Sequence, residues 1–445
     1  MDVPENQAFE FGDFVLIPKE RLLLAAGKPV HLTAKAFDLL AILVRRCGHL
    51  VSKDELLREV WPDTFVEEVN LTVNISALRK ALGQGYNGKG MIQTVPTRGY
   101  RFVAPVTTGD AALVGFRNGP TGEVVERAPD AYRAYLQGRF HWNRRSEEGL
   151  KLGAERFQRA VEIDPRFAAA YSGLADCYGT LGYLSYLSPA EAFPAARRYA
   201  TKALELDASV AEAYASMAFV KLYFDWDWPG ANTEFQRAIT LDANYAPTHQ
   251  WYSIYLLAAG RASEAFREIQ LARQRDSLSL PINSDLGFHH YYTGHYDEAV
   301  KQLKFVLEMN KDFAPAHLWL GRTYQELGRF DDALAEFRQV EERLREWPVS
   351  IAARGFVAGI AGRIDDARKI LAKLKRLAAK KFVTPYGVAL VYAGLNENDA
   401  AFEWLNKAFD ERSHWLVWLR LDPRWNGLRT DPRFSDLVSR MRFPP

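Results

Sequence analysis

Five basic side chains lie in a stretch of the chain that contains no acid. Between Val69 and Gly109 there is no Asp or Glu, whereas the same stretch holds Arg79, Lys80, Lys89, Arg98 and Arg101. The whole chain is nearly neutral, with a formal net charge of +2. The local excess of positive charge therefore indicates a surface that binds a polyanion.

The apolar residues between positions 70 and 82 recur with a helical period. They are spaced four, three and four residues apart, which predicts a helix that buries Leu71, Ile75, Leu78 and Leu82. The opposite face and its flanks would present the residues that could contact DNA: Asn70, Thr72, Val73, Asn74, Ser76, Ala77, Arg79 and Lys80. Taken alone, the segment could equally be an ordinary amphipathic surface helix with a solvated basic end.

Two short alternating segments follow this helix. MIQTV (residues 91–95) and GYRFV (residues 99–103) alternate apolar and polar side chains around the turn Pro96–Arg98, which predicts a β-hairpin. A helix followed by such a hairpin is the order of elements in a winged helix. Thr94 on the first strand and Arg98 at the turn are therefore further candidate DNA contacts, although an arginine at a turn can also simply be exposed.

The elements before the helix form its scaffold. Residues 8–32 alternate short apolar runs with Gly and Pro turn signals, which predicts a small antiparallel sheet. Thr33 is placed to cap a helix that buries Phe37, Leu40, Ala41 and Val44. Ser52 is placed to cap a second helix, with Glu55 three residues on completing a capping box. We expect residues 1–106 to form one small α+β domain.

The second half of the chain repeats itself every 34 residues. One series consists of small residues, Ala231, Ala265, Ala299, Ala333, Ala367 and Ala401. A second consists of Gly260, Gly294, Gly328 and Gly362, and a third of Phe235, Ile269, Leu303, Phe337, Leu371 and Leu405. A helix-turn-helix unit of this period is typical of tetratricopeptide repeats. The alanine lets two helices approach closely, and the glycine allows the turn, so we expect about eight units and a C-terminal pair of capping helices.

The first helix of each repeat should line the inner surface of this array. The 34-residue register places there Phe219, Tyr223, Ile254, Leu257, Phe288, Tyr291, Tyr292, Arg322 and Gln325. An aromatic groove with a few polar groups suits a peptide or helical ligand. The alternative is that these aromatic residues only pack between neighbouring repeats.

Composition and the remaining segments indicate where the protein is located and how its domains are joined. The chain has 445 residues, and 48% of them are hydrophobic. No secretory signal or membrane-spanning run is present, so we expect a cytoplasmic protein that does not enter a membrane. Residues 107–129 are rich in Gly, Thr and Pro without a period, which predicts a flexible linker. The repeat array would then occupy residues 130–445.

No pattern of residues indicates catalysis, a metal or a cofactor. The segment Gly83–Lys89 has the spacing of a phosphate-binding loop, but it follows a helix and precedes a strand, and Gly90 stands where a magnesium-binding Ser or Thr belongs. His289, His290 and His295 do not share one helical face. We therefore expect that the protein is not an enzyme.

Three blocks of the N-terminal part resemble a known family. LTAKAFDLLAILVRRCGHLVSKDELLREVW, VNLTVNISALRKAL and IQTVPTRGYRFV together are similar to the effector domain of OmpR-type winged helix-turn-helix regulators, over residues 8–106. Followed by a tetratricopeptide array, the chain resembles soluble relatives of the CadC-like transcriptional regulators. The resemblance implies a multidomain protein: a small α+β winged helix-turn-helix and an all-α tetratricopeptide solenoid.

The resemblance also implies roles for single residues. The helix of residues 70–82 would enter the major groove of double-stranded DNA, and the wing near Arg98 would reach the minor groove. Arg79 and Lys80 match the family's basic positions, and Thr94 matches a position that contacts phosphate. Ser76 and Ala77 stand where relatives often carry arginine, so the sequence departs from the pattern at the base-reading face.

We accordingly expect a DNA-binding transcriptional regulator that binds as two copies on repeated half-sites, with an array that binds a protein or peptide. The loop of residues 65–70 is either a plain connection or, as the resemblance implies, a contact with RNA polymerase. The alternative function is a scaffold whose winged helix binds protein instead of DNA, for which the small side chains of Ser76 and Ala77 leave room.

Overall fold

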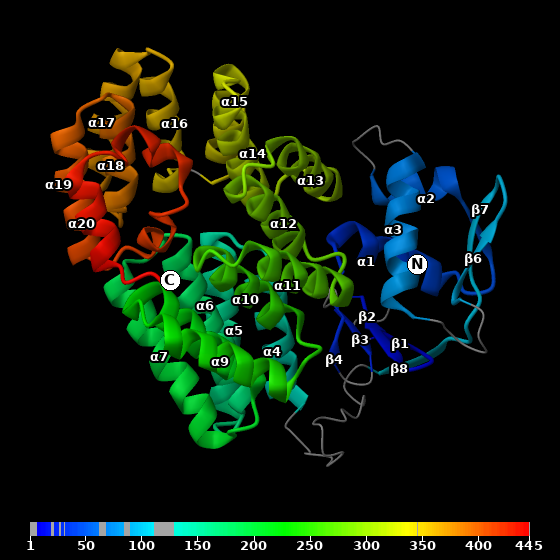
Figure 1. Cartoon of the computed structure of the whole chain (residues 1–445). Helices are drawn as coiled ribbons and strands as arrows, with labels where there is room; N and C mark the ends of the chain where they lie inside the picture. Colours follow the sequence, from blue (N-terminus) through cyan, green and yellow to red (C-terminus); the bar gives the residue numbers. More distant parts are fainter. Residues whose placement is uncertain are drawn as a thin grey trace. The chain divides into compact units, whose positions relative to one another are not determined.

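A computed structural model describes residues 7–18, 22–25, 28–30, 32–61, 68–83, 90–110, 129–344 and 346–444 (Figure 1). The chain divides into two compact units. The first comprises residues 1–136 together with the short segments 276–280 and 308–310, and the second comprises the rest. The first unit contains the predicted winged helix, and the second contains most of the predicted array.

An antiparallel sheet of five strands begins the first unit. Its order is β4 (Lys28–Pro29), β3 (Leu22–Ala25), β2 (Phe14–Ile17), β1 (Gln7–Phe11) and β8 (Thr107–Asp110). The small sheet predicted for residues 8–32 is confirmed. The predicted linker, in contrast, begins with a strand, because residues 107–110 pair with the free edge of β1. The rest of that linker, residues 111–128, lies outside the described residues.

Three helices follow the first sheet: α1 (Ala34–Arg45), α2 (Lys53–Val60) and α3 (Glu68–Ala81). The predicted caps form, since Thr33 Oγ1 accepts a hydrogen bond from the backbone N–H of Ala36 at 3.1 Å and Ser52 makes a capping box with Glu55. The predicted helical period is also correct, because at most 3% of each side chain is exposed at Leu71, Ile75, Leu78 and Leu82.

A second sheet completes the winged helix. It has the order β5 (Leu50–Ser52), β7 (Gly99–Phe102) and β6 (Ile92–Val95), and both neighbouring pairs are antiparallel. The predicted hairpin is thus confirmed, with one extra strand beside it. Tyr100 and Phe102 on β7 are 4% and 0% exposed, so the hairpin is fixed to the core of this unit by one of its faces.

Eight successive helix pairs make up the array within the described residues 129–410 (Figure 1). They are α4 (Pro129–Trp142) with α5 (Glu147–Ile163), α6 (Ala168–Tyr183) with α7 (Pro189–Leu206), α8 (Ala211–Val220) with α9 (Trp228–Leu241), α10 (Ala246–Ala258) with α11 (Ala262–Arg275), α12 (Leu280–Tyr292) with α13 (Tyr296–Met309), α14 (Ala314–Glu326) with α15 (Phe330–Arg343), α16 (Pro348–Ile360) with α17 (Ile364–Leu377), and α18 (Pro385–Gly394) with α19 (Asn398–Asp410).

The three 34-residue series have the roles that their residue types indicate. All six alanines of the first series are 0% exposed, as a close approach of two helices requires. The four glycines have φ between 72° and 83°, a left-handed conformation that costs glycine little. The same register continues to Trp226 and Asn396, whose φ values of 57° and 58° show the same turn without glycine.

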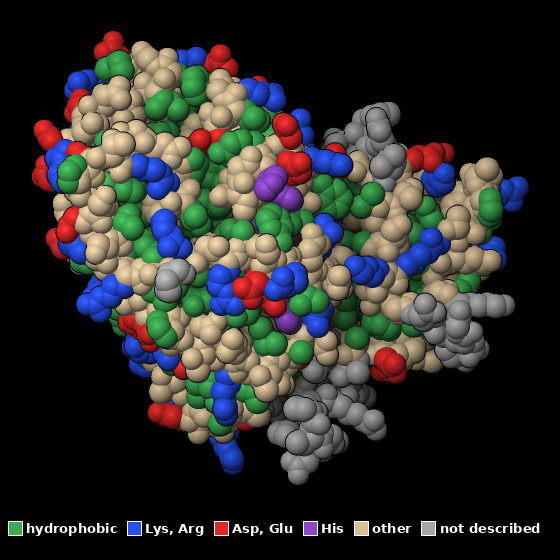
Figure 2. Space-filling view, viewed as in Figure 1, with side chains coloured by type: hydrophobic (Ala, Val, Ile, Leu, Met, Phe, Trp, Pro, Cys, Tyr) green, Lys and Arg blue, Asp and Glu red, His purple; other side chains and the backbone are tan. Residues whose placement is uncertain are grey.

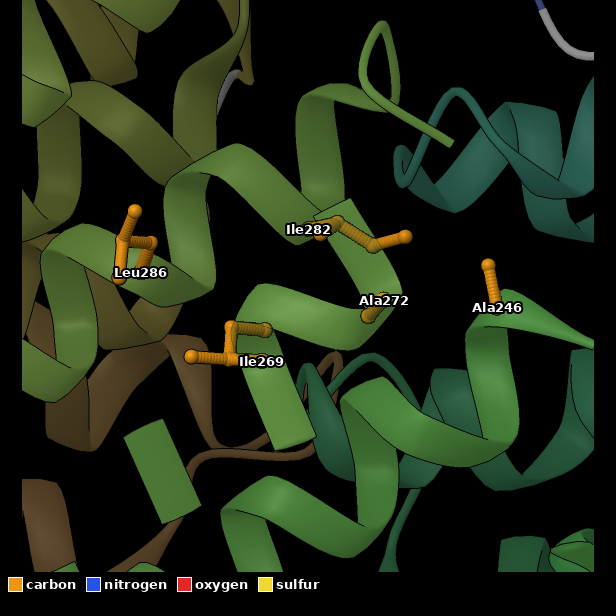
Figure 3. Packing of buried hydrophobic residues seen from close by; sticks show 5 residues of the cluster. All are labelled: Ala246, Ile269, Ala272, Ile282 and Leu286. Atoms are coloured by element: carbon orange, nitrogen blue, oxygen red, sulfur yellow. The ribbon is translucent and has the colours of Figure 1, made fainter. Parts of the chain in front are cut away.

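Neighbouring repeats share one continuous core. Figure 3 shows a part of it, in which Ala246 of α10, Ile269 and Ala272 of α11, and Ile282 and Leu286 of α12 form one buried cluster. Because each second helix is covered on one side by the following pair, the repeats bury apolar surface mainly by stacking on one another.

The C-terminal segment closes the array on itself. It consists of the 3₁₀ helices η4 (His414–Trp418) and η5 (Pro423–Leu428) and the helix α20 (Pro432–Arg440). The segment predicted to form a pair of capping helices thus contains one α-helix, which two 3₁₀ helices precede. The indole N–H of Trp415 donates to Ser185 Oγ at 3.3 Å, and that of Trp228 donates to the carbonyl of Met441 at 3.1 Å.

Candidate nucleic-acid interface

Helix α3 presents a polar stripe on its exposed face. Thr72, Ser76 and Lys80 are exposed and four residues apart, so they lie above one another along the helix. Asn70, Val73 and Ala77 are partly exposed beside them. The structure thus brings six of the predicted contact residues onto one accessible surface, with small side chains in the middle and a cation at the C-terminal end.

Asn74 is a correction to the predicted contact surface. Its side chain is only 8% exposed, and its Nδ2 donates to the backbone carbonyl of Asn70 at 2.8 Å. The reason is the helical period itself: position 74 lies three residues after Leu71, so it falls on the buried stripe beside Ile75. The structure therefore gives no support to a base contact by Asn74.

Arg79 joins helix α3 to the wing. Its Nε donates to the carbonyl of Ile92 at 3.0 Å, and its Nη2 donates to Thr94 Oγ1 at 2.6 Å. The guanidinium also lies 5.9 Å from the ring centroid of Tyr100. Arg79 and Thr94, predicted as two separate phosphate contacts, are thus bonded to each other, and Arg79 fixes the position of β6 relative to α3.

The turn between β6 and β7 presents Arg98 to solvent. The backbone N–H of Arg98 donates to the carbonyl of Val95 at 3.0 Å, and Thr97 before it has a φ of 61°. Gly99 comes next, and a Cβ there would lie only 2.1 Å from the carbonyl oxygen of Val51 on β5. The close approach of β5 therefore requires glycine at this position, which fixes where the exposed tip ends.

Basic residues beside the exposed face form ion pairs with carboxylates, whereas two basic residues on the face do not. Lys53 Nζ lies 2.5 Å from Glu68, and this hydrogen bond raises the pKa of the Lys53 ammonium above its usual value. Arg46 pairs with Glu59 at 2.6 Å. Within the described residues, by contrast, neither Lys80 nor Arg98 forms an ion pair. These two exposed cations are therefore available to a ligand.

Two other predicted features fall partly or wholly outside the described residues. Of the loop considered for RNA polymerase, residues 65–67 are not described, while Glu68 starts α3 and pairs with Lys53. Residues 84–89 of the glycine-rich segment are likewise not described. The histidines near residue 290 form no metal site in the described part of the chain, where no three His, Cys, Asp or Glu side chains gather.

The predicted partner groove of the array is covered by the chain itself. At most 7% of each side chain is exposed at Phe219, Tyr223, Ile254, Leu257, Phe288, Tyr291, Tyr292, Arg322 and Gln325. The cause is the closing segment η4: the ring of Trp418 lies 4.8 Å from that of Phe288 and stacks on Tyr292 at 4.6 Å. These residues line the inner face as predicted, but they form an interior instead of an open groove.

The array differs from the stretch around α3 in that positive and negative side chains are mixed on its surface. On the face seen in Figure 2, Lys and Arg side chains alternate with Asp and Glu side chains over the helical array. The array also holds exposed ion pairs, such as Arg329 with Asp332 and Arg363 with Asp331. The mixed charges on this face contrast with the acid-free stretch around α3, which is the candidate site for a polyanion.

Comparison with known proteins finds a similarity in each part of the chain. Residues 27–102 match the family described as "Transcriptional regulatory protein, C terminal", and residues 291–352 match the tetratricopeptide repeat. The chain joins an OmpR-type DNA-binding domain to tetratricopeptide repeats. The match of the OmpR-type domain includes α3 and both strands of the wing, which are the elements that carry the exposed face described above.

Two curated regulators and one solved structure are among the proteins similar to this OmpR-type domain. The transcriptional regulator HilA of Salmonella typhimurium is 40% identical over 101 residues, which are 23% of this chain and 18% of HilA. The transcriptional activator CadC of Escherichia coli K12 is 32% identical over 96 residues, 21% of this chain and 19% of CadC. The solved DNA-binding domain of E. coli CadC is 30% identical, with a TM-score of 0.21, and covers 23% of this chain and 98% of that one.

The chain therefore spans less than a fifth of the length of these two curated relatives. In the part of the chain that the structure describes, no helix combines the length and the apolar composition needed to cross a bilayer.

Proposed function

We propose that this protein regulates transcription by binding promoter DNA with helix α3 in the major groove and the β6–β7 turn at the adjacent backbone. The observation that carries the proposal is the exposed stripe of Thr72, Ser76 and Lys80, in a stretch without carboxylates. Lys80 and Arg98 contact phosphates, which gives affinity that depends on salt. Asn70 and Ser76 can hydrogen-bond base edges, and Val73 or Ala77 can touch a thymine methyl group.

Arg79 and Thr94 take a different part in this function. Because Arg79 is bonded to Ile92 and Thr94, it holds the wing at a fixed distance from α3. A wing and a helix that contact the same duplex must keep a fixed spacing, so these bonds set the geometry of binding. Two copies of the protein on repeated half-sites would then read a site of defined spacing.

The array supplies the regulatory half of the proposal. Tetratricopeptide repeats are a protein-interaction fold, and we infer that a protein or peptide binds this array. Its inner face is occupied by η4, so the partner would bind the outer surface or displace the C-terminal segment. Partner binding would change how two DNA-binding domains are presented, through effective concentration and not through chemistry.

Selection of genomic fragments by the purified full-length protein tests DNA binding directly. Enrichment of a repeated sequence motif supports the regulator. The alternative, a scaffold whose winged helix binds protein, predicts no enrichment even at low salt. A recovered site would also report the half-site spacing and hence how many copies bind.

The double variant Lys80→Ala/Arg98→Ala tests which residues bind the phosphates. Loss of two phosphate contacts should lower the slope of log K against log salt by about 2. Arg46→Ala is the matched control, because Arg46 is an exposed arginine already paired with Glu59. If the double variant binds the selected site with the affinity and salt slope of the unchanged protein, α3 and the wing are not the DNA-binding surface.

A further inference from the structure

A cavity lies inside the closed array. It is lined by residues of α6, α8, α10, α12 and α14 and by the closing segment η4, and it encloses about 700 Å³ with the open solvent at its mouth included. The interior of the cavity itself is much smaller, about 60 Å³, so it suits a small molecule and is too small for a folded partner. The cavity exists because the C-terminal segment covers the inner face, so it belongs to this particular array and not to repeats in general.

Aromatic rings form much of the wall. Trp251, Trp319, Trp347 and Trp415 all line the cavity. Two of the indoles are fixed in place by hydrogen bonds, since the N–H of Trp347 donates to the carbonyl of Leu184 at 2.8 Å and that of Trp415 donates to Ser185 Oγ. Rigid aromatic walls favour an apolar body, and the faces of indole rings attract a cation.

One cation enters this apolar wall from the loop after α4. Arg145 lines the cavity, is 8% exposed, and has its guanidinium carbon 3.7 Å from the ring centroid of Trp142. Its Nη1 donates to Thr180 Oγ1 at 3.2 Å. Within the described residues Arg145 forms no ion pair. Burial lowers the pKa of its guanidinium to about 10, although the charges of Asp285 and Asp176 oppose this shift. A buried cation that no carboxylate contacts directly is stabilised further when a ligand supplies the negative charge.

One anion lines the same cavity from helix α12. Asp285 accepts a hydrogen bond from Gln250 Nε2 at 2.6 Å, and no cation in the described residues pairs with it. Burial raises the pKa of its carboxyl to about 6, although the hydrogen bond from Gln250 and the charge of Arg145 oppose this rise. Ser284 beside it also lines the cavity, with a buried Oγ that has no hydrogen-bond partner among the described atoms.

We infer that this cavity binds a small zwitterion with an apolar or aromatic body, of the chemical class of an apolar α-amino acid. Its carboxylate would bind Arg145, its ammonium group would bind Asp285, and its side chain would pack among the tryptophans. A neutral polyol would offer neither side chain an opposite charge. The inference does not depend on DNA binding, so its test stands whether or not promoter binding is confirmed.

Calorimetric titration of the full-length protein tests the class of ligand. The probes are L-phenylalanine, L-leucine and L-tryptophan, together with phenethylamine and 3-phenylpropionate, which each keep one charge of phenylalanine. At least one of the amino acids should bind, and for a phenylalanine complex each one-charge analogue should bind at least about tenfold more weakly. No binding by any of the three amino acids at about 10 mM would overturn the inference.

Asp285→Asn tests the site itself. It removes one negative charge but can still accept the hydrogen bond from Gln250, so the fold should be kept. Affinity for the amino acid should fall at least about tenfold, while the binding of 3-phenylpropionate should not change. Asp297→Asn, the same substitution at an exposed position of α13, should leave both affinities unchanged.

Two results would contradict this assignment. If the amino acid has the same affinity for Asp285→Asn as for the unchanged protein, it does not bind in this cavity. Equal or tighter binding of maltose, a neutral polyol, would show that the pair of charges does not select the ligand.

Discussion

The arginine at the wing tip and two arginines of the array differ in their exposure to solvent. In the OmpR-type domain Arg98 is exposed at the wing tip. In the array Arg145 and Arg322 are 8% and 2% exposed, and the guanidinium of Arg322 lies between the rings of Trp319 and Trp415 at 4.5 and 4.8 Å. The charge of Arg98 is available to a partner outside, whereas those of Arg145 and Arg322 are enclosed. Substitutions should therefore change affinity in the first unit and stability or ligand binding in the second.

The largest expected effect is on the closure of the array. Trp418→Ala removes a ring that is 0% exposed and packs against Phe288 and Tyr292. Such a truncation should lower the free energy of unfolding of the array by about 3–5 kcal/mol. Urea unfolding followed by tryptophan fluorescence measures it. Trp404→Ala on α19, where the side chain is only partly buried, should cost clearly less; equal losses would mean that η4 does not close the interior.

The second effect is the pH dependence of stability that the enclosed carboxyl group of Asp285 should cause. The raised pKa of Asp285 means that its contribution to stability is present below about pH 4 and is lost as the pH rises through about 6. Asp285→Asn should thus stabilise the array by up to about 3 kcal/mol at pH 7.5, and by less at pH 5. Unfolding curves at both pH values measure the difference. A destabilised variant at pH 7.5 would show that the carboxylate is compensated in the folded protein.

The third effect tests whether Arg79 belongs with the exposed arginines. Arg79→Ala should lower the stability of the OmpR-type domain by about 1–2 kcal/mol, because it removes hydrogen bonds to Ile92 and Thr94. DNA affinity should fall while the salt slope stays the same. Arg79→Lys should not restore affinity, since an ammonium cannot bond to both partners as the guanidinium does. Full rescue by lysine would instead make Arg79 a phosphate contact.

The smallest expected effect is a loss of stability that should be the same in both units. Gly294 in the array and Gly83 after α3 have φ values of 77° and 68°, and a Cβ at either would meet no atom within 4 Å. Alanine at each should therefore cost only the backbone penalty of the left-handed region, about 1 kcal/mol. Thermal unfolding of the two variants measures this. A much larger loss at one position would reveal a contact that the geometry does not show.

Local patterns in the sequence were sufficient to predict most of the elements. The spacing of Leu71 and Ile75 predicted the buried side of α3, and the 34-residue step predicted alanines that are all fully buried. Asn74 was misplaced because a polar side chain on the buried stripe gives no apolar signal. Its amide bonds to its own helix, which a pattern of polar and apolar residues does not reveal.

Long-range contacts were not predictable in the same way. The 34-residue register located the residues of the inner face, but it contains no information about whether the two ends of the array meet. Trp415 lies against Ser185, 230 residues away, and the pairing of Arg79 with Thr94 crosses from a helix to a strand. Nothing in the sequence distinguished Arg145 from the many solvated arginines, because its burial depends on helices that follow much later in the chain.

The closure of the array has a consequence for how the protein folds. In an open solenoid, each repeat contacts only its neighbours, so the units can form one after another as the chain leaves the ribosome. Here three bonds, from Trp347 to Leu184, from Trp415 to Ser185 and from Trp228 to Met441, join residues 163, 230 and 213 positions apart. The bonds of Trp415 and Met441 cannot form until synthesis is almost complete. The array should therefore reach its final stability in one late cooperative step, after the N-terminal domain has had time to fold.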